Sequence, residues 1–547
     1  MKLNFNESIL HLERFEIIDS WRGSYTLGIL SKPIWMTVSS QQMRAANLAK
    51  EFTDTINKNI KTLPKKNSRI NVAIIGAGIG GLTLAHCLQA YRNSNQDFTI
   101  SIDIFEKHDV LCPIQRGCHT RRLHPNIQYW PEKYEDEFTI DYLKGNDLHN
   151  SLSWTGGLSA AEVATKVSEI FFKNFDSINK KTTKNNSITI YQGCNYLKVD
   201  KISRNYQISF SGHEILDSIG NTELSIGVKN NYDAIFFCTG FGIETEYKDK
   251  DFEVPSKKYW RNDSLGQPNL NGEPHRYLIS GNGDGAVSDT LRALLIDYKP
   301  EKLLSQLTNS NIEYLVNASH NIKTTINESN KEILQSKLES LIKQKEDSKK
   351  FPEIVPKNSK ETLNNFNKKW HDTDWKIKSK SPFKLLSEIL IWPRIKNNTE
   401  VICHFKNSSN LSELINNPFV TFYNKFFFYS LWAAGKIKIT TGDIKSLSEK
   451  FDIKKENILI RHGANYELPI KSIISENLIR KFEYCLKRRD EQLSSINKKF
   501  QDYREGRYIH EIQEPSVRFN PRKLKKIYIK NKNTLTKKQR AYFRNSR

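Results

Sequence analysis

The residues whose types and spacing most clearly indicate chemistry are four glycines in the first quarter of the chain. Residues 70–75 have the apolar pattern of a buried strand, and Gly76, Gly78, Gly80 and Gly81 follow before an apolar helical pattern. In such a G-x-G-x-x-G turn, Gly76 permits the tight turn and Gly78 removes the side chain that would block a pyrophosphate. Gly81 lets the helix pack closely on the strand while its N-terminal amides face the phosphates. The spacing predicts a dinucleotide-binding turn.

An acidic residue follows the next predicted strand. Residues 98–105 alternate between apolar and polar side chains, and Glu106 and Lys107 come directly after them. In a dinucleotide-binding unit this is the position where the hydroxyl pair of a ribose needs an acceptor. We therefore expect Glu106 to contact a ribose, and we group Lys107 with it as a cofactor-binding candidate.

A second strand–turn–helix pattern lies between residues 276 and 295. Gly281, Gly283 and Ala286 repeat the G-x-G-x-x-[GA] spacing, which indicates two nucleotides or two halves of one large site. Residues 312–316 are the next strand candidate, and neither the acid expected for NAD nor the arginine expected for NADP follows them. The choice of nicotinamide nucleotide is open.

Between the two glycine turns, the chain returns to strand character over residues 187–245. The last of these strands is buried and ends in Thr239-Gly240. Such a strand end lies at the carboxyl edge of a sheet, where a dinucleotide would bind, so both residues are cofactor-binding candidates.

Composition and charge exclude several classes of protein. At 547 residues the chain is long enough for two to four domains, and its mean hydropathy of -0.61 argues against a membrane channel or transporter. Residues 419–435 are apolar but too short to span a bilayer, so we expect a buried helix there. The seven cysteines are scattered and lack C-x-x-C spacing, and the N-terminus has no secretory pattern, which together indicate a cytoplasmic protein.

About half of the net charge of +23 lies in the C-terminal tail. Residues 515–547 contain twelve bases and no acid, interleaved with aromatic residues. Such a tail could follow a nucleic-acid backbone, but a solvated tail in a lysine- and asparagine-rich chain is the favoured interpretation.

The patterns divide the chain into six segments. We expect a helical leader packed on the first sheet (1–66), the first dinucleotide-binding domain (67–245), a second dinucleotide-binding unit (270–321), a helical insertion (322–410), a returning α/β segment (411–514) and the basic tail (515–547).

Taken together, these motifs resemble the two-dinucleotide-domain flavoproteins, in which an NAD(P)H domain interrupts an FAD domain. The order of the two glycine turns, with Thr239-Gly240 before the second, is the same. More narrowly, the stretches 37–44, 115–131, 152–154 and 279–289 are similar to a group of bacterial FAD/NAD(P)-binding oxidoreductases of unassigned substrate. The resemblance covers residues 30 to 300 well and the rest poorly. It implies an α/β fold with a Rossmann-like FAD domain, FAD as first cofactor and NAD(P)H as second.

The resemblance also suggests roles for individual residues. Glu106 would contact the adenosine ribose of FAD. Asp284 would belong either to a nicotinamide-binding turn, which the apolar helix after Ala286 favours, or to the Gly-Asp element that holds the flavin ribityl chain.

The loop at residues 115–131 is dense in polar and aromatic side chains and follows the ribose-binding strand. It could set the charge around the pyrophosphate, stack on the flavin or supply a proton donor. Gln115 is a cofactor-binding candidate, and His124 and Arg121 are the candidates for proton handling or substrate orientation. The competing interpretation is a structural histidine with arginines paired to acids.

Cys112 and Cys118 lie near the position where disulfide reductases carry a redox pair. Their C-x5-C spacing differs from the C-x2-C or C-x4-C of that group and would put the thiols on different faces of a helix. Without a redox disulfide, electrons would pass to dioxygen or to a small organic substrate.

The sequence therefore predicts an FAD-dependent oxidoreductase, reduced by NAD(P)H and monooxygenase-like on a small substrate. One alternative is an amine or amino-acid oxidase type, in which the second glycine turn is only a flavin contact. The other is a non-catalytic nucleotide-sensing module with a basic partner-binding tail. No metal site and no membrane association are expected, and the oligomeric state is open.

Overall fold

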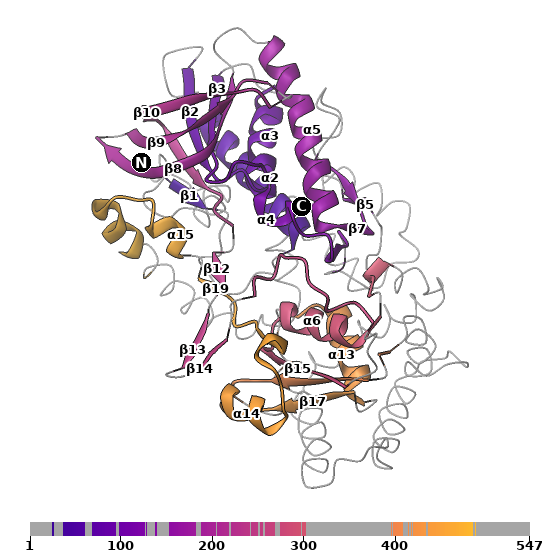
Figure 1. Cartoon of the computed structure of the whole chain (residues 1–547). Helices are drawn as coiled ribbons and strands as arrows, with labels where there is room; N and C mark the ends of the chain where they lie inside the picture. The colour runs from indigo at the N-terminus through magenta and orange to yellow at the C-terminus, as the bar shows by residue number, and fades with distance from the viewer. Residues whose placement is uncertain are drawn as a thin grey trace, which may run out of the picture.

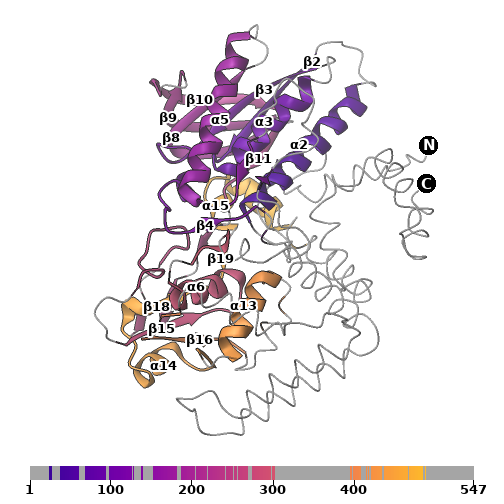
Figure 2. The same cartoon turned by 90° about the vertical axis from the view of Figure 1, so that its right-hand side faces the viewer.

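The chain forms two α/β bodies, each built on its own sheet, as a computed structural model shows (Figures 1 and 2). The structure describes residues 24–26, 37–60, 68–93, 98–125, 127, 137–138, 152–181, 187–203, 205–217, 220–240, 242–244, 246–249, 252–254, 257–268, 274–296, 298–301, 395–396, 398–407, 414, 417, 420–433, 436–465, 467–484 and 487.

The first body contains a seven-stranded sheet among the described residues. Its strands are β1 (Ser24–Thr26), β2 (Ser68–Ile75), β3 (Phe98–Phe105), β8 (Ile188–Ile202), β9 (Asn205–Ile215), β10 (Thr222–Tyr232) and β11 (Ala234–Phe237). Their order is β1-β11-β2-β3-β8-β9-β10, with β1, β11, β2, β3 and β8 parallel and β8, β9 and β10 an antiparallel meander. Because β3 and β11 lie on opposite sides of β2, the strand order reverses at the carboxyl end of β2, where open parallel sheets bind ligands.

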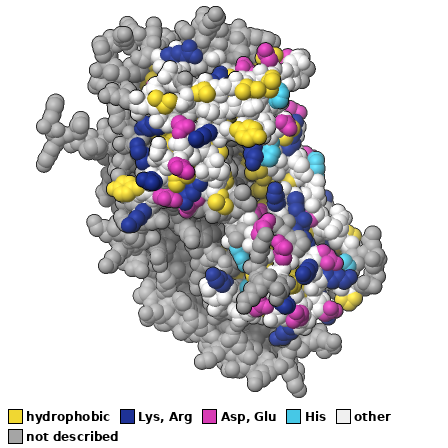
Figure 3. Space-filling view, turned by 60° about the vertical axis from the view of Figure 1, so that its left-hand side comes forward, with side chains coloured by type: hydrophobic (Ala, Val, Ile, Leu, Met, Phe, Trp, Pro, Cys, Tyr) yellow, Lys and Arg dark blue, Asp and Glu magenta, His cyan; other side chains and the backbone are white. Residues whose placement is uncertain are grey.

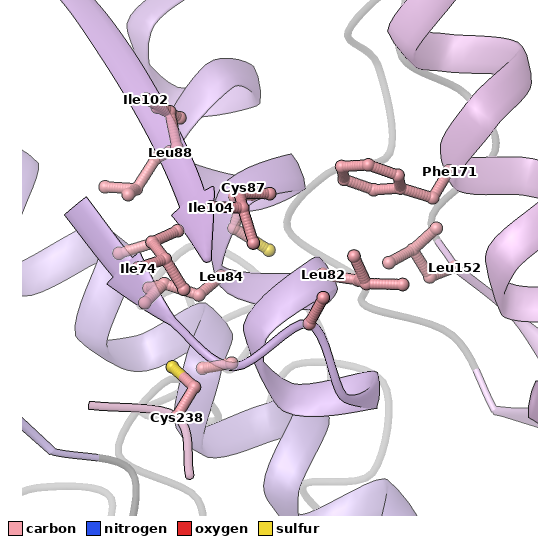
Figure 4. Close-up of a cluster of buried hydrophobic side chains, with 14 of the residues drawn as sticks. Ile74, Leu82, Leu84, Cys87, Leu88, Ile102, Ile104, Leu152, Phe171 and Cys238 are labelled. Atoms are coloured by element: carbon pink, nitrogen blue, oxygen red, sulfur yellow. The ribbon is translucent and has the colours of Figure 1, made fainter. Parts of the chain in front are cut away.

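Helices α2 (Val38–Ile60), α3 (Ile79–Asn93) and α5 (Ala160–Lys181) pack on one face of this sheet. In Figure 4, Leu84 of α3 lies against Ile74 of β2, and Leu82 points toward Leu152 and Phe171. The leader helix joins the same core, since the rings of Phe52 in α2 and Phe236 in β11 meet edge to face at 5.0 Å. Each such buried side chain contributes roughly 1.5–3 kcal/mol of hydrophobic stabilisation.

The second body contains a four-stranded parallel sheet. Its strands are β15 (His275–Ser280), β16 (Thr399–His404), β17 (Ile437–Thr440) and β18 (Ile458–Ile460), in the order β17-β16-β15-β18. The helices are α6 (Asp284–Leu294), α13 (Phe422–Ala433), α14 (Ile444–Lys450) and η2 (Lys455–Asn457).

Alternation along the strands decides which helix covers which face of the second sheet. Ile279 and Cys403 pack against α6 and α13, whereas Leu278 and Ile402 pack against α14 on the other face. Strands β16 and β18 lie on opposite sides of β15, so the order again reverses at the strand that precedes a glycine turn.

Shorter elements complete the two bodies and the crossings between them. They are α4 (Pro113–Arg116), α15 (Glu467–Lys471) and the pairs β4 (Arg122–Leu123) with β7 (Leu158–Ser159), β5 (Glu137–Phe138) with β6 (Trp154–Thr155), β12 (Ile243–Glu244) with β19 (Ala464–Asn465) and β13 (Tyr247–Asp249) with β14 (Phe252–Val254). The chain leaves the first body after β11 and returns after β19. Ile470, Ile474, Leu478 and Phe482 then pack on the first sheet beside Tyr191 and Phe237.

The predicted α/β fold with two Rossmann-like units is confirmed. One boundary needs correction: β16 lies inside the segment 322–410 that was predicted to be a helical insertion, and the strands at 437–460 complete the second sheet. Residues 1–23, the strand expected at 312–316, residues 322–394 and the basic tail lie outside the described residues.

The surface charges and the length of the apolar helices are relevant to the class of membrane channels and transporters. On the side seen in Figure 3, Lys and Arg side chains are interspersed with Asp and Glu over both bodies. No helix in the part of the chain that the structure describes is long and apolar enough to cross a bilayer, and residues 422–433 form the buried helix α13.

Candidate dinucleotide sites

The first glycine turn has the backbone geometry that its spacing predicts. Gly76 has φ +105°, and a Cβ there would lie 2.4 Å from the carbonyl oxygen of Cys238 at the end of β11. A Cβ at Gly81 would lie 2.0 Å from the Gly76 carbonyl oxygen, whereas a Cβ at Gly78 would meet no atom within 4 Å. Two glycines therefore permit close packing of the backbone, and the middle one borders open space at the N-terminus of α3.

Glu106 lies beside this turn. Its Oε2 accepts a hydrogen bond from the Ala77 amide at 2.7 Å, and its Oε1 accepts one from the His108 amide at 3.0 Å. The side chain is 4% exposed, and burial raises its pKa although the amides oppose the shift. Glu106 thus follows β3, the strand next to β2, and its carboxylate is hydrogen-bonded to the backbone of the glycine turn.

The remaining candidates of the first body surround the same strand ends. Thr239 and Gly240 follow β11 next to Gly76, and Gly240 has φ +75°. Gly80 lies half-buried in the first turn of α3, Gln115 is buried in α4, and Lys107 is exposed beside Glu106. The structure brings these residues together at one edge of the first sheet.

The second glycine turn repeats the arrangement on the second sheet. Gly281 has φ +134°, and a Cβ there would lie 2.4 Å from the carbonyl oxygen of Arg461, which follows β18. Gly283 precedes α6, and a Cβ there would meet no atom within 4 Å. Ala286 is buried in the position of the third glycine. Both turns therefore combine a tight first glycine with an open second glycine.

The Asp284 side chain is hydrogen-bonded to residues at the start of another helix. Its Oδ1 accepts hydrogen bonds from the Thr421 amide and from Asn424 Nδ2, both at 2.8 Å, at the start of α13. Burial raises its pKa, and these bonds oppose the shift. The carboxylate therefore ties the start of α13 to α6.

Sequence reasoning missed a cluster at the carboxyl edge of the second sheet. Ser280 Oγ lies 2.7 Å from His404 Nδ1 at the end of β16 and 2.6 Å from His462 Nε2 after β18. Burial lowers the pKa of both histidines, and Lys406 lowers that of His462 further. No local signal could have found this cluster, because its members come from three strands.

Arg121 lies in a contact between the two bodies. Its guanidinium is 3% exposed, pairs with Asp289 at 2.8 Å and lies 3.7 Å from the centre of the Tyr259 ring. Asp263 and Asp289 both lie within ion-pair distance of the guanidinium, which is the arrangement that the competing interpretation of arginines paired to acids describes. His124 is 4% exposed, and Pro125 beside it accepts a hydrogen bond from Ser39 of α2 at 2.7 Å.

The two cysteines considered for redox chemistry are free thiols with different surroundings. Cys112 faces Ser168 Oγ at 3.7 Å, whereas Cys118 Sγ donates to the Arg261 carbonyl oxygen at 3.4 Å. Burial raises the pKa of both thiols, that of Cys112 to about 12, which disfavours the reactive thiolate.

Comparisons with known proteins agree with this geometry at the level of the fold. The family described as NAD(P)-binding Rossmann-like domain matches residues 74–122, which contain the first glycine turn and Glu106. No curated relative matches the sequence.

Three of the similar solved structures are two monooxygenases and a protein in complex with NADPH. A polycyclic ketone monooxygenase from Thermothelomyces thermophila is 10% identical with a TM-score of 0.24, over 71% of this chain and 60% of its own. DfoA bound to FAD, a cadaverine monooxygenase from Erwinia amylovora, is 8% identical with a TM-score of 0.18, over 40% and 46%. FprA from Mycobacterium tuberculosis in complex with NADPH is 9% identical with a TM-score of 0.15, over 41% and 49%. The chain thus spans less than two thirds of the length of each, and the likeness is too low to carry a functional argument.

Proposed function

We propose that this protein is an FAD-dependent oxidoreductase that takes hydride from NAD(P)H and acts, in the manner of a monooxygenase, on a small organic substrate. The observation that carries the proposal is the pair of glycine turns. Each follows the strand at which a parallel sheet reverses its order, and each leaves open space at its second glycine. Two such sites in one chain suit an enzyme that passes a hydride from one nucleotide to another.

The residues of the first turn fit FAD. Open space at Gly78 admits the diphosphate, and the helix α3 that begins beside it presents amides to the negative charge. The Glu106 carboxylate is within the same turn and would exchange its bond to the Ala77 amide for the ribose hydroxyls. Bound FAD supplies hydride acceptance and electron transfer, and the protein supplies binding and orientation.

The residues of the second sheet favour NADPH over NADH. In Rossmann units the end of the second strand meets the adenosine ribose, and an acid there accepts from the hydroxyls of NAD. Here β16 is that strand; it ends at His404, and Phe405 and the exposed Lys406 follow it. The nearby Asp443 is engaged by Ser446 at the N-terminus of α14 at 2.8 Å. A 2′-phosphate would meet the cation Lys406 at this edge, whereas the nearby acid Asp443 already accepts a hydrogen bond from Ser446.

The test is anaerobic mixing of FAD-reconstituted protein with NADPH and with NADH. The proposal predicts that NADPH bleaches the flavin faster than NADH and that admitted dioxygen restores the colour. Protein that does not bind FAD contradicts the flavoenzyme assignment. Bound flavin that responds to neither nucleotide, but is bleached by amines or amino acids, supports the oxidase alternative.

A further inference from the structure

The two bodies contact each other through part of the loop at residues 115–131, for which the sequence predicted a role at the cofactor or in catalysis. Residues 117–122 of the first body contact residues 259–263, which lead into the second. Asn262 Nδ2 donates to the Gly117 carbonyl oxygen at 2.8 Å, and Asn262 Oδ1 accepts from the His119 amide at 2.7 Å. On the outer side, Arg122 pairs with Glu301 at 3.0 Å.

Charged side chains form the buried part of this contact. We name it the Asp289 cluster, and it comprises Arg121, Asp263, Asp289, Arg292 and Arg461. Asp289 has no exposed surface, and it pairs with Arg121 at 2.8 Å, with Arg461 at 2.8 Å and with Arg292 at 3.3 Å. Asp263 pairs with Arg292 at 2.6 Å. These arginines hold the pKa of Asp289 well below its usual range, which favours the charged carboxylate.

The cluster is attached to both glycine turns by short stretches of backbone. On the second body, Asp289 and Arg292 lie on α6, which begins next to Gly283, and the carbonyl of Arg461 is in contact with Gly281. On the first body, the amide of Cys112 donates to the Ala77 carbonyl oxygen at 2.9 Å, and the chain continues through α4 to Arg121. A displacement of one body at this contact therefore displaces one turn relative to the other.

A buried contact of this kind can fix the position of one nucleotide site relative to the other. Arginine forks have fixed hydrogen-bond directions, and a buried pair cannot exchange its partner for water without a large penalty. Hydride transfer requires the donor and acceptor atoms to be held close together, and misplacement by about 1 Å can cost about 100-fold in rate.

We propose that the Asp289 cluster positions the two nucleotide sites for hydride transfer, with Arg121 and Asp289 as positioning residues that touch neither nucleotide. This inference rests on the proposed function. It replaces a substrate-contacting role for Arg121 with a role exerted through the relative placement of the two bodies.

The primary test is Arg121→Gln, because Asp289 keeps Arg292 and Arg461 as partners in that variant. The matched control is Arg276→Gln, which removes a pair with Glu400 inside the second body. Anaerobic flavin reduction over a range of NADPH concentrations separates the Kd for NADPH from the limiting rate of reduction. We expect the limiting rate to fall at least about tenfold in Arg121→Gln while Kd and flavin content stay within about threefold, and to be unchanged in the control. Arg121→Lys restores part of the rate.

A folded Arg121→Gln with an unchanged limiting rate overturns the proposal, as does a rise in Kd alone. If Arg121→Gln does not fold, Asn262→Ala tests the same contact at an exposed position. We then expect a smaller decrease in the limiting rate of reduction, again with little change in the Kd for NADPH. An unchanged limiting rate in that variant also overturns the proposal.

A second readout does not depend on bound nucleotide. Hydrogen exchange of residues 117–122 in the nucleotide-free protein should accelerate in Arg121→Gln and not in Arg276→Gln. Unchanged exchange overturns the positioning contact whatever the flavin does. Wild-type protein that binds FAD but is not reduced by NADPH instead overturns the proposed function, and with it the hydride-transfer role, even where the exchange result is as expected.

Discussion

Substitution of the two glycines Gly76 and Gly78 by alanine should separate folding from cofactor binding. At Gly76 the added Cβ would lie 2.4 Å from a backbone carbonyl oxygen, and φ is +105°, a conformation that L-residues rarely adopt. Left-handed strain of about 1–2 kcal/mol and a backbone clash together predict a loss of about 3 kcal/mol or more in the free energy of unfolding.

At Gly78 the added Cβ meets no protein atom within 4 Å, and φ is not positive. The free energy of unfolding should therefore change by less than about 0.5 kcal/mol, because the folded backbone is not strained. The methyl group instead occupies the space that the diphosphate needs. Loss of about 2–3 kcal/mol of binding free energy corresponds to about a 30- to 150-fold weaker affinity for FAD.

The assay is thermal melting of the nucleotide-free variants together with fluorescence titration of FAD. Gly266→Ala is the matched control, since a Cβ there also meets no atom within 4 Å but lies outside both turns. Gly78→Ala that melts like the wild type and binds FAD with wild-type affinity would refute the reasoning, and so would a Gly76→Ala variant of unchanged stability.

Three further predictions concern the second site and the core. Gly283→Ala should weaken binding of NADPH and leave FAD binding unchanged, since its Cβ also enters open space, and titration of the two nucleotides checks both statements. Lys406→Glu should raise the ratio of KM for NADPH to KM for NADH by about tenfold, because it removes a cation from the end of β16 and supplies an acceptor for a diol; an unchanged ratio contradicts the assignment of that edge. Burial lowers the pKa of His86 to about 4, so the unfolded state binds a proton first as the pH falls below about 6.5. The free energy of unfolding should therefore decrease by up to about 3 kcal/mol between pH 6.5 and pH 4. His86→Leu should flatten that part of the stability profile in chemical denaturation.

The glycine turns could be predicted from the sequence because their requirements are local. A positive φ at Gly76, the close approach at Gly81 and the acid one strand later are all set within some thirty residues of chain. The same holds for the second turn, where Gly281 and Gly283 lie on one strand–helix corner.

The partners of these elements could not be predicted, because they lie far away in the sequence. Strand β16 follows β15 by more than a hundred residues, so no local pattern indicates that the two strands pair. Arg121 is of a residue type common in binding sites, yet its contacts are with Asp289 and Tyr259, which lie far from it in the sequence. Types and spacing cannot distinguish an arginine that faces a ligand from one that holds two bodies together.

The most direct test of the central claim is equilibrium titration of the purified protein with FAD, followed by its absorbance and fluorescence. We predict a stoichiometric complex with the spectrum of a protein-bound flavin, and loss of that complex in Gly78→Ala but not in Gly266→Ala. Protein that binds no FAD, or binds it equally well with a methyl group at Gly78, would contradict the claim that the first glycine turn holds the diphosphate.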